Sequence, residues 1–386
     1  MTGKINPIYL DYSATTPMAD EAVEAMMPFF KERFGNPSSI HRFGQQADAA
    51  IEEAREVIAE HLNCSVDEVI FTSGGTESDN LALRGVALAQ RERSGKNHLL
   101  ISPVEHHAVS HTAQQLASIF GFELEFLPVD GQGRVDPAEV LERLRPNTAV
   151  VSVIYANNEI GTINSISEIG KICREKGVPF HTDAVQATPY LSLDVEALSV
   201  DLLSLGAHKF YGPKGVGVLY VRKGTPILPI QTGGGQESGL RSGTQNVPYI
   251  VGMSAALKFV QTSQTKWNAS LPTLRDWLIE QVEQKIPQST LTGHRTQRLP
   301  NHASFVFEGV DSQKLLTLLD LDGFACSSGS ACKTGNPSPS EVLLALGFPQ
   351  KLALGSLRVT LGKDTTAEHV QLFFDCLVEK IKILRD

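Results

Sequence analysis

Apolar residues along the first two-thirds of the chain form two kinds of pattern. Between residues 47 and 62 they recur every three or four positions, which is typical of an amphipathic helix. Short apolar runs follow, most of them separated by further helical patterns. These runs cover residues 68–72, 98–102, 122–129, 148–155, 178–183, 201–205 and 216–221. Strands separated by helices need crossover connections, so we expect an α/β fold with a mostly parallel sheet of seven strands, covered on both faces.

The pattern changes after about residue 260. A long helical stretch over residues 253–285 leads into two further strand-like runs, 303–308 and 356–361, with helical patterns between and after them. We therefore expect a large domain over residues 16–260. A smaller α+β domain is expected to combine residues 1–15 with residues 261–386.

Charge and cysteine usage narrow the classes of function. The chain has 386 residues, with 34 Lys and Arg against 43 Asp and Glu, a formal net charge of −9. This acidic balance argues against nucleic acid or an anionic membrane as a partner. The five cysteines show no Cys-x-x-Cys spacing, so neither a disulfide framework nor a zinc ribbon is predicted. The N-terminus has no apolar leader and no run is long enough to span a membrane, so a cytoplasmic protein is expected.

In a parallel sheet, ligands bind beyond the carboxyl ends of the strands, so the residues after each strand are the first candidates. Thr72–Ser78 (TSGGTES) joins the first strand to a helix. A glycine turn before a helix N-terminus exposes backbone N–H groups and favours an anion. The segment lacks the Lys of a Walker loop and the spacing of a dinucleotide fingerprint. A capped glycine turn without a ligand is the alternative.

Two charged residues follow later strands. Asp183 ends the run 178–183, and Lys209 follows the run 201–205. They could form a buried ion pair. Together with an upstream phosphate cradle they also fit pyridoxal phosphate, whose aldehyde bonds to a lysine and whose ring nitrogen pairs with a carboxylate.

Three further segments carry candidate chemistry. His106 and His107 follow one strand and could stack on a planar ring, and Asn158 follows another. The Gly/Ser-rich segment 323–335 contains Cys326 and Cys332. Lys333 beside Cys332 would favour a thiolate, whereas Cys326 ends an apolar run and is expected to be a small buried hydrophobe.

These segments together resemble the cysteine desulfurases, a branch of the class V, fold-type I pyridoxal phosphate enzymes. The likeness extends over nearly the whole chain. Its motifs are YLDYSATTP (9–17), GNPSSIHRFG (35–44), TSGGTES (72–78), VEHHAV (104–109), ANNEIGT (156–162), HTDAVQ (181–186), AHKFYGPKGVG (207–217), GGGQESGLRSGTQN (233–246), SSGSAC (327–332) and SLRVTLGK (356–363).

The resemblance implies a role for each matching residue. Lys209 would hold pyridoxal phosphate and later take a proton from the substrate, His106 would shuttle protons, and Cys332 would accept sulfur. Asn158 and Arg358 would hold the substrate, with the Arg358 guanidinium on its carboxylate. The remaining cofactor contacts would be Asp183 at the pyridine nitrogen, Gln186 at the phenolic oxygen, His106 on the ring, Asn158 beside it, Gly75, Thr76 and His208 at the phosphate, and Thr244 from a second copy of the chain.

The chain departs from the family's pattern in a few places. Gly206 stands where many relatives have a serine, so one phosphate hydroxyl would be missing. Lys333 stands where a Thr is common, and Cys326 is not a usual family position.

The implied reaction converts L-cysteine to L-alanine and leaves a persulfide on Cys332. Protein acceptors such as an iron–sulfur scaffold or a thiolation enzyme would then take the sulfur, and a homodimer is expected. A selenocysteine lyase would use the same pocket, and a comparison of rates on cysteine and selenocysteine separates the two. A class V aminotransferase, or a scaffold that has lost activity, would also fit the fold.

Overall fold

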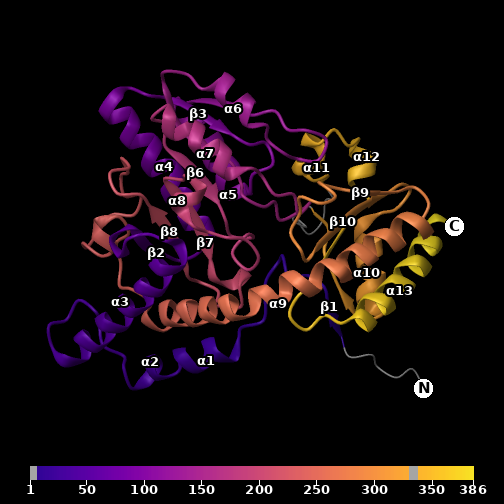
Figure 1. The fold of residues 1–386 in the computed structure, drawn as a ribbon, viewed down its shortest axis with the longest axis horizontal. Helices are drawn as coiled ribbons and strands as arrows, with labels where there is room; N and C mark the ends of the chain where they lie inside the picture. Colours follow the sequence, from indigo (N-terminus) through magenta and orange to yellow (C-terminus); the bar gives the residue numbers. More distant parts are fainter. Residues whose placement is uncertain (1–6, 330–337) are drawn as a thin grey trace.

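The computed structural model describes residues 7–329 and 338–386 of the chain. Its elements form two groups joined by one long helix, α9 (Val247–Lys285), which Figure 1 shows running between them. Cys332 lies outside the described residues.

The first group is built on a seven-stranded sheet in the order β2-β8-β7-β6-β5-β3-β4. Its strands are β2 (Val69–Thr72), β3 (His98–Ile101), β4 (Glu123–Phe126), β5 (Thr148–Ser152), β6 (Phe180–Asp183), β7 (Leu202–Gly206) and β8 (Gly217–Val221). Neighbouring strands run parallel except at β8, which is antiparallel to both β2 and β7. The predicted α/β class and mostly parallel sheet are therefore confirmed.

Side chains of β2, β3, β5, β7 and β8 enter two apolar clusters on opposite faces of this sheet. In β7, Leu202 packs in the cluster that contains α4 and α5 residues, whereas Leu203 packs in the larger cluster that contains α3 and α7 residues. These strands are buried on both faces, which explains why they read as continuous apolar runs, whereas β4 at the sheet's edge is partly exposed. The helices of this group are α1 (Asp20–Met26), α2 (Pro28–Lys31), α3 (Arg42–Leu62), α4 (Gly75–Ser94), α5 (His107–Phe120), α6 (Pro137–Arg143), α7 (Ile166–Glu175) and α8 (Val195–Leu198), with 3-10 turns at Val66–Glu68, Ala207–Lys209 and Glu237–Gly239.

The second group contains a three-stranded antiparallel sheet in the order β12 (Ser356–Thr360), β10 (His302–Phe307), β9 (Ser289–Leu291). A separate pair of strands, β1 (Ile8–Tyr9) and β11 (Phe324–Ala325), runs parallel. The N-terminal segment therefore lies beside the residues that lead toward position 329. The helices here are α10 (Ser312–Leu321), α11 (Glu341–Ala345), α12 (Gln350–Ala353) and α13 (Ala367–Arg385).

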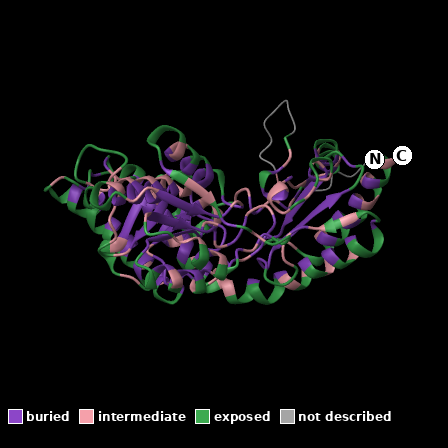
Figure 2. Cartoon of the chain, turned by 90° about the horizontal axis from the view of Figure 1, so that it is seen from above, coloured by how far each residue is buried: buried purple, intermediate pink, exposed green. Residues whose placement is uncertain are grey.

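Helix α9 contacts α1 and α3 of the first group and β9, β10 and α13 of the second. The boundary expected between residues 260 and 261 falls inside this helix. Figure 2 shows that most strands of both groups are buried, while exposed residues gather on the surrounding helices and loops. Within the described chain, no helix combines the length and the apolar character needed to cross a membrane.

Candidate functional site

A cavity of about 220 Å³ lies beyond the carboxyl ends of the parallel strands, where a ligand site is expected. The residues expected to bind the cofactor, Thr244 excepted, line it together. The lining residues are Gly75, Thr76, Asp79, His106, Ile154, Asn158, Asp183, Val185, Gln186, His208 and Lys209. We call this the first cavity.

The first turn of α4 forms one wall of the first cavity. Thr72 and Ser78 share a hydrogen bond of 2.8 Å, which closes the turn between β2 and α4. A side chain at Gly75 would place its Cβ 2.7 Å from Val185 Cγ2, so glycine lets the helix end come this close to the wall. The first amides of a helix have no partner within it, so this end offers N–H groups and a positive dipole to an anion.

Three buried carboxyl groups lie near one another at the site: Asp79 and Asp183 line the first cavity, and Glu105 interacts with both through its charge. Burial raises the pKa of Asp183, Asp79 and Glu105, and the charge of Asp183 adds to the rise at the other two. Asp183 Oδ1 accepts a hydrogen bond from Val185 N at 2.9 Å, whereas Asp79 Oδ1 has no hydrogen-bond partner. None of the residues that the structure describes forms an ion pair with Asp183.

This charge pattern fits pyridoxal phosphate. A protonated ring nitrogen beside Asp183 would supply the positive charge that the buried carboxyl groups lack, and a phosphate would meet the amides at the start of α4. The cofactor carries a positive charge at its protonated ring nitrogen and a negative charge at its phosphate. The cavity offers a carboxyl group to the first and backbone amides to the second.

Lys209 enters the cavity from the turn after β7. Its Nζ donates hydrogen bonds to the carbonyl oxygens of Ser13 at 2.5 Å and Ala14 at 2.7 Å. Burial and the nearby charge of Arg358 lower the pKa of Lys209 to about 8. Lys209 thus stands within the cavity with an amine that is easier to deprotonate than an exposed lysine, and the alternative of a direct ion pair with Asp183 is not what the structure contains.

His106 caps α5 with one ring nitrogen. Its Nδ1 accepts a hydrogen bond from Ala108 N at 3.1 Å, so Nε2 is the nitrogen left for other partners. Desolvation lowers the pKa of His106, with Asp183 opposing and Lys209 adding to the shift. The ring is therefore mostly neutral near pH 7.

A second cavity of about 260 Å³ adjoins the first and shares His106, Asn158 and Lys209 with it. Its other lining residues are Ser13, Ala14, Glu105, His107, Glu159, Ser327, Ser328, Gly329 and Arg358. Ser327–Gly329 lead directly to the segment that carries Cys332, so this cavity lies next to the start of that segment.

Arg358, on β12, is positioned by two of its five N–H donors. Nη1 donates to Asn158 O and Nη2 to Asp11 Oδ1, both at 2.9 Å. Its Nε has no hydrogen-bond partner although it is buried. The guanidinium therefore keeps donors for a carboxylate in the second cavity.

The remaining expected site residues lie as follows. Gln186 Nε2 donates to Ser13 O at 2.8 Å, and His208 Nδ1 is 3.2 Å from Thr15 Oγ1. Thr244 is exposed and does not line the first cavity of its own chain.

The sequence reasoning missed Asp79, Glu105 and Glu159. Each lies inside or next to a motif already singled out. The available signal was a carboxyl group that follows a buried strand or lies in the first turn of a helix at the edge of the site.

The four cysteines in the described part of the chain are poor nucleophiles. Burial raises the pKa of Cys64 and Cys376 to about 12, and it raises the pKa of Cys173 and Cys326 as well. This result agrees with the expectation that Cys326 behaves as a small buried hydrophobe and not as the nucleophile.

The chain is similar to known proteins over nearly its whole length. Residues 8–373 match the family model described as Aminotransferase class-V. The chain is 50% identical over 378 residues to "Cysteine desulfurase IscS" of Dictyoglomus turgidum, covering 98% of this chain and 95% of that protein. It is 47% identical over 379 residues to "Cysteine desulfurase IscS" of Methanosarcina thermophila, covering 98% and 93%.

Solved structures give the same picture. A "NIFS-like protein" superposes with a TM-score of 0.90 at 36% identity, covering 98% of this chain and 100% of the other. A structure described as "SspA in complex with cysteine" has a TM-score of 0.78 at 35% identity, covering 92% and 98%.

Proposed function

We propose that Lys209 of this chain holds the cofactor and that Cys332 accepts the sulfur. The chain belongs to the aminotransferase class-V family and is a cysteine desulfurase that depends on pyridoxal phosphate. One observation carries the assignment of these two residues. Lys209, Asp183, His106 and the first turn of α4 line a single cavity, and the cavity beside it adjoins the residues that lead to Cys332.

The residues that would hold the cofactor divide by the part of it they meet. Gly75, Thr76 and His208 bind the phosphate, with Thr244 of a second copy added to them. Asp183 meets the ring nitrogen, Gln186 the phenolic oxygen, and His106 the face of the ring, with Asn158 beside it. When bound, the cofactor's ring withdraws electrons from the bonds at the substrate's α-carbon.

L-cysteine is the substrate we assign to the second cavity. The Arg358 guanidinium forks onto its carboxylate, and Asn158 supports the same end. Lys209 Nζ, with its pKa near 8, is the base that takes the α-proton. His106 moves a proton at Nε2, because Nδ1 is occupied by the Ala108 amide.

The Cys332 thiolate then attacks the substrate's sulfur. The S–S bond forms as the C–S bond breaks, and the electron pair of the C–S bond goes to the substrate's β-carbon. Protonation of the β-carbon and return of a proton to the α-carbon complete L-alanine. The persulfide left on Cys332 carries the sulfur to an acceptor protein, such as an iron–sulfur scaffold or a thiolation enzyme. We assign the enzyme to the cytoplasm.

A homodimer is part of the same proposal. Thr244 is exposed in its own chain, which leaves it available to the cofactor of a second copy. Large apolar side chains on α1, α2 and the start of α3 are exposed as well. The exposed rings of Phe34 and Phe43 stack with centroids 5.6 Å apart, and exposed apolar side chains that gather in this way are typical of protein–protein contacts.

The assignment of Cys332 is tested by measuring alanine and sulfide together after cysteine is added with a reductant. Cys332→Ser should abolish the release of both products while leaving the cofactor's absorbance intact. Cys326→Ser is the matched control and should retain turnover, because its buried thiol is not the acceptor. Unchanged turnover in Cys332→Ser refutes the assignment.

A further inference from the structure

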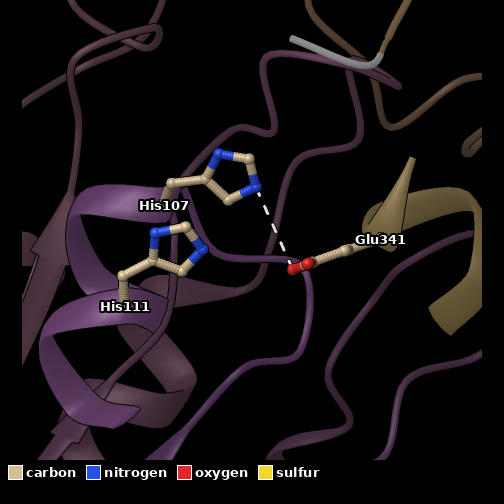
Figure 3. Close-up of side chains that lie close together, drawn as sticks. All are labelled: His107, His111 and Glu341. Atoms are coloured by element: carbon tan, nitrogen blue, oxygen red, sulfur yellow. Dashed lines mark ion pairs between the residues drawn. The ribbon is translucent and has the colours of Figure 1, made fainter. Parts of the chain in front are cut away.

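Two histidines and a glutamate lie close together, as Figure 3 shows. None of the three lines the first cavity. His107 and His111 come from the first two turns of α5, and Glu341 is the first residue of α11. The two imidazole rings stack with centroids 4.6 Å apart and planes 11° from parallel. His107 Nε2 lies 3.9 Å from Glu341 Oε2.

The spacing matches what a metal ion needs. His107 and His111 are four residues apart, so they project from one face of α5, as metal-binding histidine pairs on helices do. One ligand atom from each of the three residues lies within 4.8 Å of the other two. In a tetrahedral zinc site with bonds of about 2.1 Å, two ligand atoms stand about 3.4 Å apart. The 3.9 Å pair lies within about half an ångström of this spacing, and small rotations of the three exposed side chains bring all three ligand atoms to it.

We propose that His107, His111 and Glu341 bind a divalent transition-metal ion of the zinc type. Two imidazoles and one carboxylate are ligands that Zn²⁺ accepts readily, and solvent completes the coordination because all three side chains are exposed. The proposal rests on the geometry of these side chains and is independent of the reaction assigned to the cavities.

The position of this site gives it a structural consequence. His107 also lines the second cavity, and the preceding His106 caps α5. Glu341 follows Ser340, which caps α11 and donates a hydrogen bond of 2.5 Å to Glu159. A bound ion would therefore tie the start of α5 to the start of α11, beside the second cavity.

The test is a titration of the cofactor-loaded protein with Zn²⁺ in competition with a chromophoric chelator. We expect one ion per chain to bind at this site. His111→Ala and Glu341→Gln should each weaken that binding by at least about tenfold, since even the loss of a residue that only orients a ligand costs that much. His369→Ala and Glu368→Gln, in the first turn of α13, are the matched controls and should leave it unchanged.

Thiols also bind zinc, so the same titration is made with Cys332→Ser. The proposed site predicts that this variant keeps the His111-dependent ion. If Zn²⁺ binding is lost in Cys332→Ser but kept in His111→Ala, the ion sits on the thiol and the proposal is wrong. Equal binding by wild type, His111→Ala and Glu341→Gln overturns it too. Retained cofactor absorbance in each variant shows that the fold is intact.

Discussion

The surroundings of Lys209 set the pKa of its amine well below that of an exposed lysine. Burial among the residues of the first cavity lowers its pKa to about 8, and Arg358 contributes in the same direction. A lysine in water titrates near pH 10.4. The folded chain therefore provides the neutral amine, which is the form that bonds to an aldehyde, at a pH where an exposed lysine is almost wholly charged.

We predict that apoprotein takes up pyridoxal phosphate faster as the pH rises, with a midpoint near 8. The rate is followed by the absorbance of the linked cofactor after mixing. Lys209→Ala should develop no such absorbance at any pH. A rate that is flat across neutral and mildly alkaline pH, or that rises only near the titration of free lysine, contradicts the prediction.

Gly206 lies beside the proposed phosphate cradle. A Cβ added there would stand 3.3 Å from Gly75 N and 3.5 Å from Val185 Cγ1. A serine would thus carry its hydroxyl close to the amides at the start of α4. We predict that Gly206→Ser binds pyridoxal phosphate several-fold more tightly, since one added hydrogen bond contributes about 1 kcal/mol.

Gly206→Ala is the matched variant for this experiment, because it adds the Cβ without the hydroxyl. Cofactor affinity, measured by equilibrium dialysis of the apoproteins, should rise in the serine variant alone. If alanine and serine change it equally, the added carbon and not the hydroxyl is responsible, and the missing-hydroxyl interpretation fails.

At the scale of elements, Glu159 joins three parts of the chain. It follows β5 and accepts a hydrogen bond from the Ser340 hydroxyl at the start of α11. A Cβ at Gly329 would lie 2.8 Å from its Oε2, so Gly329 also lies close to it. Burial raises the pKa of Glu159 to about 7, while Ser340 and Arg358 pull it down. The folded chain therefore holds this proton more tightly than the unfolded chain does.

Glu159 should make the protein less stable as the pH rises from about 4.5 to about 7, because over that range the native state binds more protons than the unfolded state. Glu159→Gln removes this dependence. The thermal midpoint of this variant should therefore rise relative to that of the wild type as the pH rises through the same range. Glu168→Gln, an exposed carboxylate in the first turn of α7, should show no such gain. A constant difference between Glu159→Gln and wild type is the contrary result.

The elements differ in how well the sequence predicts them. The central strands can be predicted because burial on both faces leaves a largely apolar run, as in β5 and β7. Their ends cannot, since β5 stops at Ser152 where apolar residues continue to Tyr155. The contacts among Asp79, Glu105 and Asp183 could not be predicted either, because they join strands and a helix that only the tertiary fold brings together. The distances that define the zinc-type site are of the same kind.

At the scale of the whole molecule, one helix joins the parts that supply the site. The first cavity is built by the seven-stranded sheet and α4, whereas Arg358 comes from β12 of the second sheet. Helix α9 contacts both groups. Thr244 lies just before this helix, so a second copy that contacts this region would also extend the site.

The exposed apolar side chains of α1, α2 and the segment into α3 are the surface we expect a second copy to cover. Phe34 and Ile40 are 65% and 93% exposed, and the Phe34 ring stacks on Phe43 at 5.6 Å. We predict that Phe34→Asp combined with Ile40→Asp yields a monomer by sedimentation, because two charges would have to be buried. The monomer should also bind pyridoxal phosphate less tightly, since Thr244 of the second copy is removed. Leu321→Asp, 76% exposed on α10, should stay dimeric. A double variant that remains dimeric places the interface elsewhere.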